Sequence, residues 1–511
     1  MSDKSLSAAS SATGIPSAER PISFQEKEKS ESFLVDKLAL DDPYNPQGWS
    51  AATKWYITMQ AGLLVLNATF ASSAPGGIAQ ALIEEFHFSR EVQILTVSLF
   101  VAGYCVGPLL WGPLSEEFGR RPIFLGTFFV YMMFQIGAAL AHNTATILIT
   151  RFLGGVFAAA PLANSGAVIS DIWDAKSRGR ALAIFTLAPF AGPTLGPTVA
   201  GFIYVSGTSW RWLFWILAIF AGVCWILMLF TLPETYMPIL LVQHAQKLRK
   251  ETGDDRYYAP KEVTKKTLGQ QVEHVLLRPF KMLFQEPMLL AMTLYMSFVY
   301  GCLYLCFAAY PIVFTEGHHL NAGISGLMYI PIMGGGVLAV TLYSFIFSPR
   351  YEREVERCAP NPVVPEFRLE TALIAAPLYA ASFFWFGWTS YPSVSLWAPL
   401  MSGVLTGFGI CWIFLGLFNY IIDTYLISAA TALSVTTVVR SIFGAAFPLF
   451  GAQMYEALSP RWASSLLGFV AIAMTPIPFV FMKYGATLRA RSKYTPSTSS
   501  ERLKESENSA A

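Results

Sequence analysis

Charged side chains are scarce in this sequence of 511 residues. Asp, Glu, Lys and Arg make up 13% of it, whereas a soluble globular domain has about 25%. Apolar residues make up 54%. This composition excludes an ordinary soluble protein and indicates a polytopic membrane protein. The net charge of +2 is too small to indicate a nucleic-acid partner.

Several chemical signatures are missing as well. The six cysteines lie mostly in apolar runs and form no disulfide framework. Those runs also lack clusters of His, Cys or acidic residues at catalytic or metal-binding spacing. We therefore expect no enzymatic activity, no metal and no cofactor. The phosphate-binding pattern G-x-x-x-x-G-K-[ST] is absent too, so the sequence does not predict an ATP-driven pump.

Long apolar runs are the main feature that is present. A helix needs about 20 apolar residues to cross a bilayer core, and the sequence has two sets of six such runs. We predict an all-α membrane protein with twelve transmembrane helices in two six-helix halves. The first six spans are expected near 55–77, 92–112, 122–141, 146–169, 180–204 and 211–232. The other six are expected near 288–314, 324–347, 370–389, 394–418, 430–452 and 463–482.

The polar segments give the expected domain boundaries. Residues 51–232 and 288–484 form the two six-helix halves, and residues 233–287 form a basic central loop. Residues 1–50 are rich in Ser, Glu and Lys and too poor in apolar runs to repay the entropy of ordering, so we expect a disordered tail without a cleaved signal peptide. Residues 485–511 form a second tail.

Basic residues gather on one side of the predicted spans. If both tails and the central loop are cytoplasmic, the outer loops keep little more than Arg90, Arg211 and Arg461. We therefore predict a multi-pass protein with both termini in the cytoplasm. The basic residues then placed in the cytoplasm are Arg120, Arg121, Lys176, Arg178, Arg180, Arg350, Arg353, Arg357, Arg368, Lys483, Arg489, Arg491 and Lys493.

The stretch 112–121, with the sequence GPLSEEFGRR, forms a tight charged turn between two predicted spans. Its glycines permit close helix approach and positive φ, and Glu116 precedes Arg120 by the four residues that pair charges across one helical turn. An ordinary positive-inside loop is the alternative interpretation. The pattern resembles the loop signature of the major facilitator superfamily, in which such a loop latches one packing of the helices. The signature residues here are Gly112, Ser115, Glu116, Gly119, Arg120 and Arg121, with Glu116 where the family more often has Asp.

The fifth predicted span contains the run Gly-Pro-Thr-Leu-Gly-Pro at 192–197. Small residues four apart allow close helix contact, and each proline bends the helix, so a kinked packing helix would also fit. The run resembles the antiporter signature of drug exporters, carried here by Gly192, Pro193, Gly196 and Pro197, with Pro197 where a second glycine is more usual. The resemblance covers roughly residues 43–490 and is to fungal twelve-span drug:proton antiporters. It implies the major facilitator fold.

Two arginines are the charged residues expected at depth, where Asp, Glu, Lys and His are lacking. A charge inside a span costs roughly 2.5–3.5 kcal/mol, so Arg151 should face a wet cavity or a partner, unless it snorkels to the headgroups. Arg151 also resembles the arginine of a third family signature. Arg440 lies in a stretch similar to the eleventh helix of fungal drug exporters, and we expect it to act in substrate binding or gating.

The side chains expected to line the substrate path are polar or aromatic. They are Asn67, Gln135, Asn164, Tyr300, Tyr304, Tyr329, Phe408 and Trp412. A path without carboxylates suits a neutral or weakly acidic amphipathic molecule and does not suit a polycation. The same lack leaves proton coupling without an obvious acid in the membrane. The candidates are Asp423, just after the tenth span, with Glu116, Asp171, Glu84 and Glu85.

These observations predict a secondary active transporter that exports small amphipathic compounds such as drugs, fungal toxins or secondary metabolites. Proton antiport and alternating access of the two halves are implied by the resemblance. We expect a monomer in the plasma membrane whose partners are its substrate, protons and lipid. A proton-coupled importer of a nutrient and a polyamine exporter are the alternatives. The Gly-Pro run disfavours the importer, and the lack of membrane carboxylates disfavours the polyamine exporter.

Overall fold

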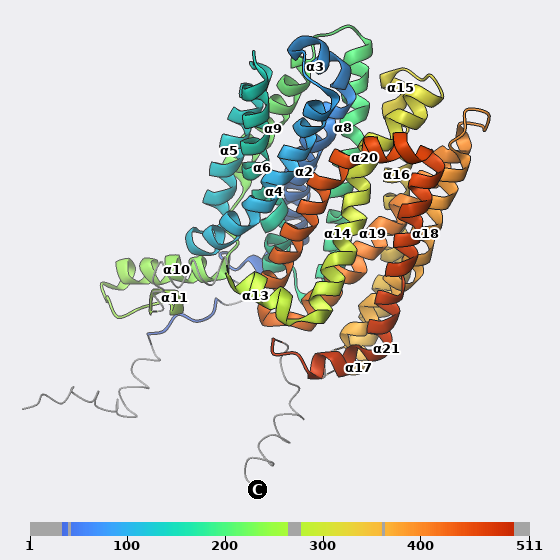
Figure 1. Ribbon diagram of the computed structural model, residues 1–511. Coiled ribbons are helices and arrows are strands. Elements are labelled where there is room, and N and C mark those ends of the chain that lie inside the picture. Colours follow the sequence, from blue (N-terminus) through green and yellow to red (C-terminus); the bar gives the residue numbers. More distant parts are fainter. Residues whose placement is uncertain (1–32, 39–41, 264–276, 360–362, 495–511) are drawn as a thin grey trace, which may run out of the picture. The chain divides into compact units, whose positions relative to one another are not determined.

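The computed structural model describes residues 33–38, 42–263, 277–359 and 363–494 (Figure 1). Their regular secondary structure is helical, apart from one isolated parallel bridge. The chain divides into two compact units: a small one around residues 33–38 and 241–263, and a large helical one that contains the rest. Most of the predicted disordered tail lies outside the described residues.

The small unit joins the N-terminal segment to part of the central loop. Leu34 pairs with Tyr258 in the parallel bridge, and the guanidinium of Arg256 lies 4.1 Å from the ring centre of Phe33. An ion pair of 2.6 Å joins Arg249 to Glu262. The predicted central loop therefore contains regular structure: α10 (Met237–Thr252), α11 (Pro260–Val263) and α13 (Arg278–Gln285).

The first half of the large unit contains six spans, as predicted. Side-chain caps help to set where its helices begin: Ser50 accepts from the amide of Thr53 at 3.2 Å, and Asn143 accepts from that of Thr146 at 2.7 Å. The helices are α2 (Ala51–Ser73), η2 (Ala74–Ile78), α3 (Ala79–Phe86), α4 (Arg90–Phe118), α5 (Arg120–Ala139), α6 (Thr144–Ile172), α7 (Ala175–Phe185), α8 (Leu187–Val205) and α9 (Arg211–Thr231).

The second half begins after α13 and has the more interrupted helices. Its elements are α14 (Pro287–Tyr310), η4 (Pro311–Gly317), α15 (Ala322–Leu327), α16 (Ile330–Leu342), η5 (Tyr343–Phe347), α17 (Ser348–Cys358), η6 (Pro365–Leu369), α18 (Glu370–Thr389), α19 (Trp397–Tyr425), η7 (Leu426–Ser428), α20 (Ala429–Met474) and α21 (Pro476–Ala490). The last of these helices extends into the segment predicted as the C-terminal tail.

Among the described residues, eleven helical stretches are long and apolar enough to cross a membrane. The last stretch, Ala429–Ala490, is 62 residues long and bends inside α20, where Ser459 has φ 62° and Pro460 follows. Since about 20 residues span a bilayer core, this stretch holds two spans. The predicted pair of six-span halves is therefore confirmed.

The outer face of α9 shows how these helices meet lipid. Its large exposed side chains recur every three or four residues, so they form one apolar stripe along the helix. They are Trp212, Ile216, Ile219, Val223, Ile226 and Phe230, with Leu227 beside them. The opposite face of the helix is buried in the unit. Such a stripe is unfavourable in water and favourable against hydrocarbon, which agrees with the composition.

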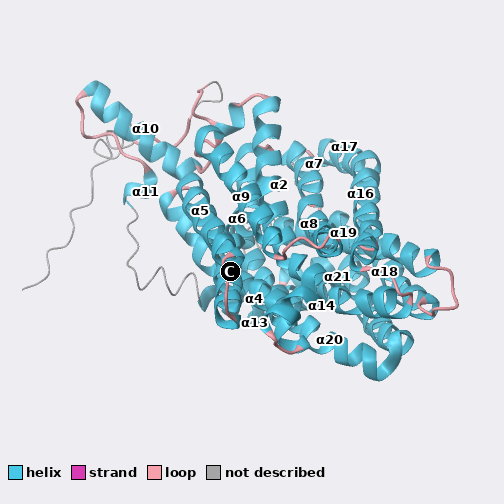
Figure 2. Cartoon of the chain, turned by 90° about the horizontal axis from the view of Figure 1, so that it is seen from above, coloured by secondary structure: helices cyan, strands magenta, loops and turns pink. Residues whose placement is uncertain are grey.

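The two halves meet mainly along two sets of helices, and α7 also contacts α17 and η5. α4 packs against α20, and α8 packs against α15 and α16. Viewed end on in Figure 2, α5, α6 and α9 of the first half lie on the left, and α16 and α18 of the second half on the right. We call the end where α4 meets α5 the latch end, and the end where α3 meets α4 the clasp end. In Figure 1 the clasp end is at the top.

Candidate functional site

The predicted latch loop is a break between two helices. Gly119 has φ 100° and ψ 160°, a conformation open essentially to glycine, so α4 ends at Phe118 and α5 begins at Arg120. Arg120 forms an ion pair with Asp171 at the end of α6, with Nε 3.4 Å from Oδ2, and donates to Ser115 Oγ at 2.5 Å. The predicted pairing of Glu116 with Arg120 across one helical turn is wrong, because the two residues lie on different helices.

A carboxylate that the sequence analysis missed fastens this loop. Glu234, in the segment after α9, accepts hydrogen bonds from four backbone amides, and its carboxylate lies where a Cβ on Gly119 would be. A side chain at position 119 would therefore collide with the acceptor that holds the loop. The donors are Arg120, Arg121, Thr235 and Tyr236, at 2.9, 3.1, 3.0 and 2.9 Å.

An aromatic ring completes the surroundings of Arg120. The guanidinium lies 4.7 Å from the ring centre of Tyr236. Burial, and then the nearby charge of Glu116, raise the pKa of Tyr236 to about 12. The phenol is therefore neutral at physiological pH, so it faces the cation as an uncharged ring.

Asn164 was predicted to line the substrate path, and in the structure it contacts α4 next to the latch loop. Its Oδ1 accepts from Ser115 Oγ at 3.0 Å, and its Nδ2 donates to the carbonyl of Trp111 at 3.2 Å. Because Ser115 also accepts from Arg120, the amide orients the hydroxyl that Arg120 needs. Asn164 thus supports the latch by two hydrogen bonds.

The second half has a comparable pair at the latch end. Arg368 in η6 donates to Asp423 near the end of α19, with Nε 2.8 Å from Oδ2, and its guanidinium lies 3.4 Å from the ring centre of Tyr351. Nearby, Arg489 pairs with Glu366 at 3.0 Å. Asp423, a predicted coupling acid, is therefore already engaged by a cation. Only its position after the tenth span had drawn attention to it.

The predicted antiporter run packs α8 against α2. A Cβ on Gly192 would meet Thr69 Oγ1, and one on Gly196 would meet Ser73 Oγ and, at 2.9 Å, the backbone of Phe70 and Ala74. The glycines therefore permit a helix contact inside the first half. The end of the run reaches the other half, because Thr198 Oγ1, directly after Pro197, donates to the carbonyl of Gly326 at 2.7 Å.

Arg151 is held by backbone carbonyl groups, and only its Nη1 is buried without an acceptor. Its exposed fraction is 1%. Its Nε donates to the carbonyl of Thr96 at 2.8 Å, and its Nη2 donates to those of Ala71 and Ser72 at 2.7 and 3.2 Å. The guanidinium also lies 4.1 Å from the ring centre of Phe100. Arg151 therefore ties α6 to α2 and α4. It does not snorkel to the headgroups.

Two further path candidates are packed inside their own halves. Asn67 is fully buried and its Oδ1 accepts from Tyr131 at 2.6 Å. Trp412 is buried against Phe408, and its indole donates to the carbonyl of Ala339 at 2.7 Å. In this conformation both are core residues, and the Nδ2 of Asn67 is buried without a hydrogen-bond partner.

Tyr304 lies where the halves meet, and Arg440 lies on α20, the helix that packs against α4 of the first half. The hydroxyl of Tyr304, on α14, lies 2.8 Å from Ser72 Oγ on α2, so it links the two halves in the interior. Arg440, on α20, lies among the rings of Tyr300, Phe414 and Phe418. Of the predicted candidates, these two residues contribute most directly to the seam between the halves.

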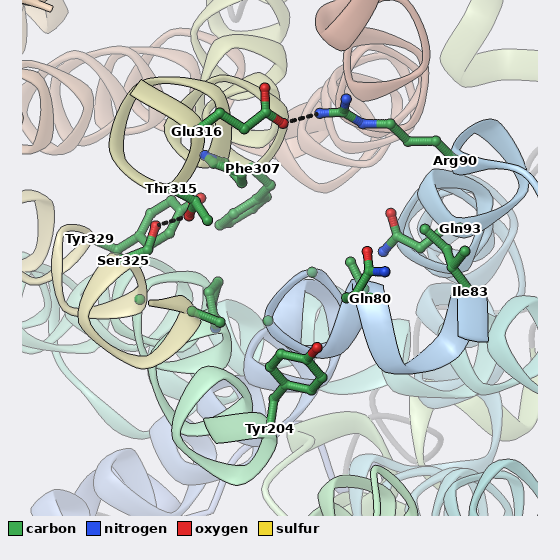
Figure 3. Close-up of a pocket in the computed structure, with 17 residues that line it drawn as sticks. Gln80, Ile83, Arg90, Gln93, Tyr204, Phe307, Thr315, Glu316, Ser325 and Tyr329 are labelled. Carbon is green, nitrogen blue, oxygen red and sulfur yellow. Dashed lines mark hydrogen bonds and ion pairs between the residues drawn. The ribbon is translucent and has the colours of Figure 1, made fainter. Parts of the chain in front are cut away.

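At the clasp end, the seam widens into a cavity of about 280 Å³ (Figure 3). Residues of both halves line it, including Gln80, Gln93 and Tyr204 from the first and Phe307 and Tyr329 from the second. Pro197 of the antiporter run also lines it. Of the lining residues, only Tyr329 and Pro197 were candidates from the sequence, and Arg90 was expected merely as a basic residue of an outer loop. The others stand in no recognisable pattern.

Arg90 bridges the halves beside this cavity. It begins α4 and reaches Glu456 on α20 at 2.8 Å and Glu316 in η4 at 3.4 Å. Figure 3 shows the contact with Glu316. We call these three residues the clasp. Among side chains that the structure describes, ion pairs between the halves are found only here, since the latch-end pairs each join residues of one half.

Comparisons with known proteins agree with this architecture. The family model of the Major Facilitator Superfamily matches residues 61–448. The chain is 44% identical to the major facilitator superfamily multidrug transporter mdrA of Aspergillus fumigatus, over 89% of this chain and 74% of that protein. It is 43% identical to the MFS-type efflux pump MFS2 of Trichophyton rubrum, over 91% and 78%. Among solved structures, the xylose transporter XylE from E. coli matches with a TM-score of 0.58 at 18% identity, over 84% and 99%, which shows the shared fold.

Proposed function

This chain belongs to the major facilitator superfamily, and from that premise we propose that it is a secondary transporter that exports small amphipathic organic molecules. The observation that carries the proposal is its similarity, over most of its length, to fungal relatives named as a multidrug transporter and an efflux pump. The interior agrees with such a substrate, because the rings of Phe190 and Phe414 meet across the seam between the halves and Tyr300 packs against Phe414.

The proposed mechanism is alternating access. The clasp of Arg90 with Glu316 and Glu456 holds the halves together at one end, and both carboxylates must release Arg90 before that end can open. The latch pairs at the other end keep each half rigid, because each joins helices of the same half. Two rigid halves that rock about a central seam can expose it to either side in turn.

We place the latch end in the cytoplasm and the protein in the plasma membrane, acting as a monomer. The positive-inside rule supports the orientation, since most basic residues of the short loops lie at the latch end. A monomer is sufficient because the seam is formed by the two halves of one chain. The clasp then faces the outside, and compounds enter from the cytoplasm.

Proton antiport is the proposed driving reaction. Asp171 and Asp423 each hold an arginine at the latch end, so a proton on either carboxylate would weaken an ion pair and release that arginine. Export of a polyamine is disfavoured, because the seam offers the cation Arg440 to its substrate and pairs no described carboxylate with it. No feature of the site specifically supports import of a nutrient.

Export and its energy source can be tested together in cells that overproduce the protein. The cells are loaded with labelled 2-naphthoate and 2-naphthamide, an acidic and a neutral compound with one ring system, and efflux is followed before and after a protonophore is added. We expect faster efflux than in control cells and loss of the difference after the gradient collapses. Efflux that persists would contradict proton coupling, and faster uptake would contradict export.

A pair of glycine variants tests whether efflux depends on the close packing of α8 against α2. Gly196→Leu should abolish efflux, because the side chain would push α8 away from Ser73 and Phe70. Gly126→Leu should be tolerated, because a Cβ there meets nothing within 4 Å. Both variants should reach the membrane in normal amounts. Equal efflux by the two variants would show that close packing of α8 on α2 is not needed for transport.

A further inference from the structure

Arg440 differs from four arginines already described in having no polar partner among the described residues. Arg120, Arg368 and Arg489 pair with carboxylates, and Arg151 donates to three carbonyl groups. For Arg440, by contrast, no hydrogen bond or ion pair to a described residue is present, and its Nε is buried without an acceptor.

The surroundings of Arg440 are aromatic. Its guanidinium carbon lies 4.9 Å from the ring centre of Tyr300, 5.6 Å from that of Phe418 and 5.7 Å from that of Phe414. Ring faces attract a cation, but far less than a carboxylate does, and they accept none of its five N–H groups in a normal hydrogen bond. The side chain keeps partial exposure and, of its nitrogens, Nε is the buried one, so a dissolved molecule can reach the terminal Nη donors.

The ring cluster extends across the seam. Phe190 on α8 packs against Phe414 with their ring centres 5.7 Å apart, and Tyr300 lies 3.5 Å, hydroxyl to hydroxyl, from Tyr304. Tyr304 in turn contacts Ser72 of the first half. A molecule bound at Arg440 would therefore touch the helices that must separate when the halves rock, which is where a transported compound should bind.

We propose that Arg440 and the rings of Tyr300, Phe414 and Phe418 form an anion subsite, which selects amphipathic aromatic acids as substrates. This inference rests on the proposed export function. The planar guanidinium offers two parallel N–H groups that match the two oxygens of a carboxylate, and the rings pack against the aromatic body. The substrate's carboxylate supplies the negative charge that no described side chain places beside Arg440. A cation of the same shape would be repelled by the guanidinium.

Three probes with one ring system separate charge from shape. They are 2-naphthoate, 2-naphthamide and 2-naphthylmethylammonium, which are anionic, neutral and cationic. Their binding to the purified full-length protein in lipid nanodiscs is measured by equilibrium dialysis. We expect naphthoate to bind roughly tenfold or more tightly than the amide, and the ammonium compound to bind least. Equal binding of the three, or no binding of naphthoate, overturns the subsite.

Variants test whether the preference for naphthoate over naphthamide depends on Arg440. Arg440→Gln should bind naphthoate no better than naphthamide, whereas Arg440→Lys should keep part of the preference because it keeps the charge. Phe414→Leu should weaken naphthoate and naphthamide alike, since it removes ring contact only. The same change at an exposed arginine of α17, Arg353→Gln, is the control and should leave all three affinities unchanged. A preference for naphthoate that survives in Arg440→Gln overturns the assignment.

The outcome for the subsite is separable from that for export. Arg440-dependent binding of naphthoate without efflux from cells would refute the export function and leave the anion subsite standing. Efflux of naphthamide and naphthoate at equal rates, in the parent and in Arg440→Gln, would leave export standing and refute the subsite.

Discussion

The two halves hold their latch ends by the same kind of contact. In the first half, Arg120 at the start of α5 pairs with Asp171 near the end of α6; in the second, Arg368 just before α18 pairs with Asp423 near the end of α19. The partners are 51 and 55 residues apart in the chain. Both arginine side chains are 7% exposed, and both stack on a tyrosine ring.

The halves differ in what surrounds that pair. In the first half, Glu234 also accepts hydrogen bonds from four backbone amides beside Gly119. Asn164 orients the hydroxyl of Ser115. The second half has no comparable glycine turn among its described residues; η5, α17 and η6 separate its spans there, and Arg489 pairs with Glu366 nearby. The same geometry is therefore built from different sequences, and only the first version carries a recognisable motif.

The largest effect that separates the halves is expected at Gly119, because only the first half depends on a glycine in this conformation. Gly119→Ala combines an unfavourable φ, which alone costs about 1–3 kcal/mol, with a collision against Glu234, which adds to the loss from the latched state. The backbone strain alone corresponds to about 5- to 150-fold in the conformational balance. Export assays and thermal unfolding of the purified protein measure it.

Gly112→Ala is the matched control for that variant. Gly112 belongs to the same motif, yet a Cβ there meets nothing within 4 Å. Export should stay close to that of the parent. If both alanine variants behaved alike, the importance of the turn at Gly119 would be refuted.

The next effect compares the two ion pairs directly. Asp171→Asn and Asp423→Asn each leave a buried arginine without its carboxylate, which costs about 1.5–3 kcal/mol for a charged hydrogen bond. We expect the larger loss of thermal stability for Asp423→Asn, because its contact is 2.8 Å and that of Asp171 is 3.4 Å. If Asp423→Asn left thermal stability unchanged while Asp171→Asn lowered it, only the first half would have a working latch.

The smallest effect is expected at Glu116, although the motif makes it the conspicuous acid. Glu116 is exposed, and Arg120 forms its ion pair with Asp171. Glu116→Gln should therefore lower export by less than about threefold, as for an exposed charge interaction, and Glu116→Asp by less still. A loss in Glu116→Gln as deep as that in Asp171→Asn would restore Glu116 as the central acid of the latch.

The sequence alone determined the fold class, the twelve spans in two halves and the place of the latch loop. These depend on local properties: a span is recognised by the length of its apolar run, and the turn at Gly119 by its own glycine and charges. Arg151 and Arg440 were singled out for the same reason, because a charge within an apolar run is visible without knowledge of its neighbours.

Only the tertiary structure decided which groups these residues meet. Arg120 pairs with Asp171 and not with Glu116, and Arg90 reaches Glu456 from 366 residues away in the chain. Arg151 finds three carbonyl groups, whereas Arg440 finds rings alone. The physical reason is that an ion pair forms only when the two groups lie within about 4 Å, and which groups do so depends on how separate helices pack. No pattern along one helix contains that information.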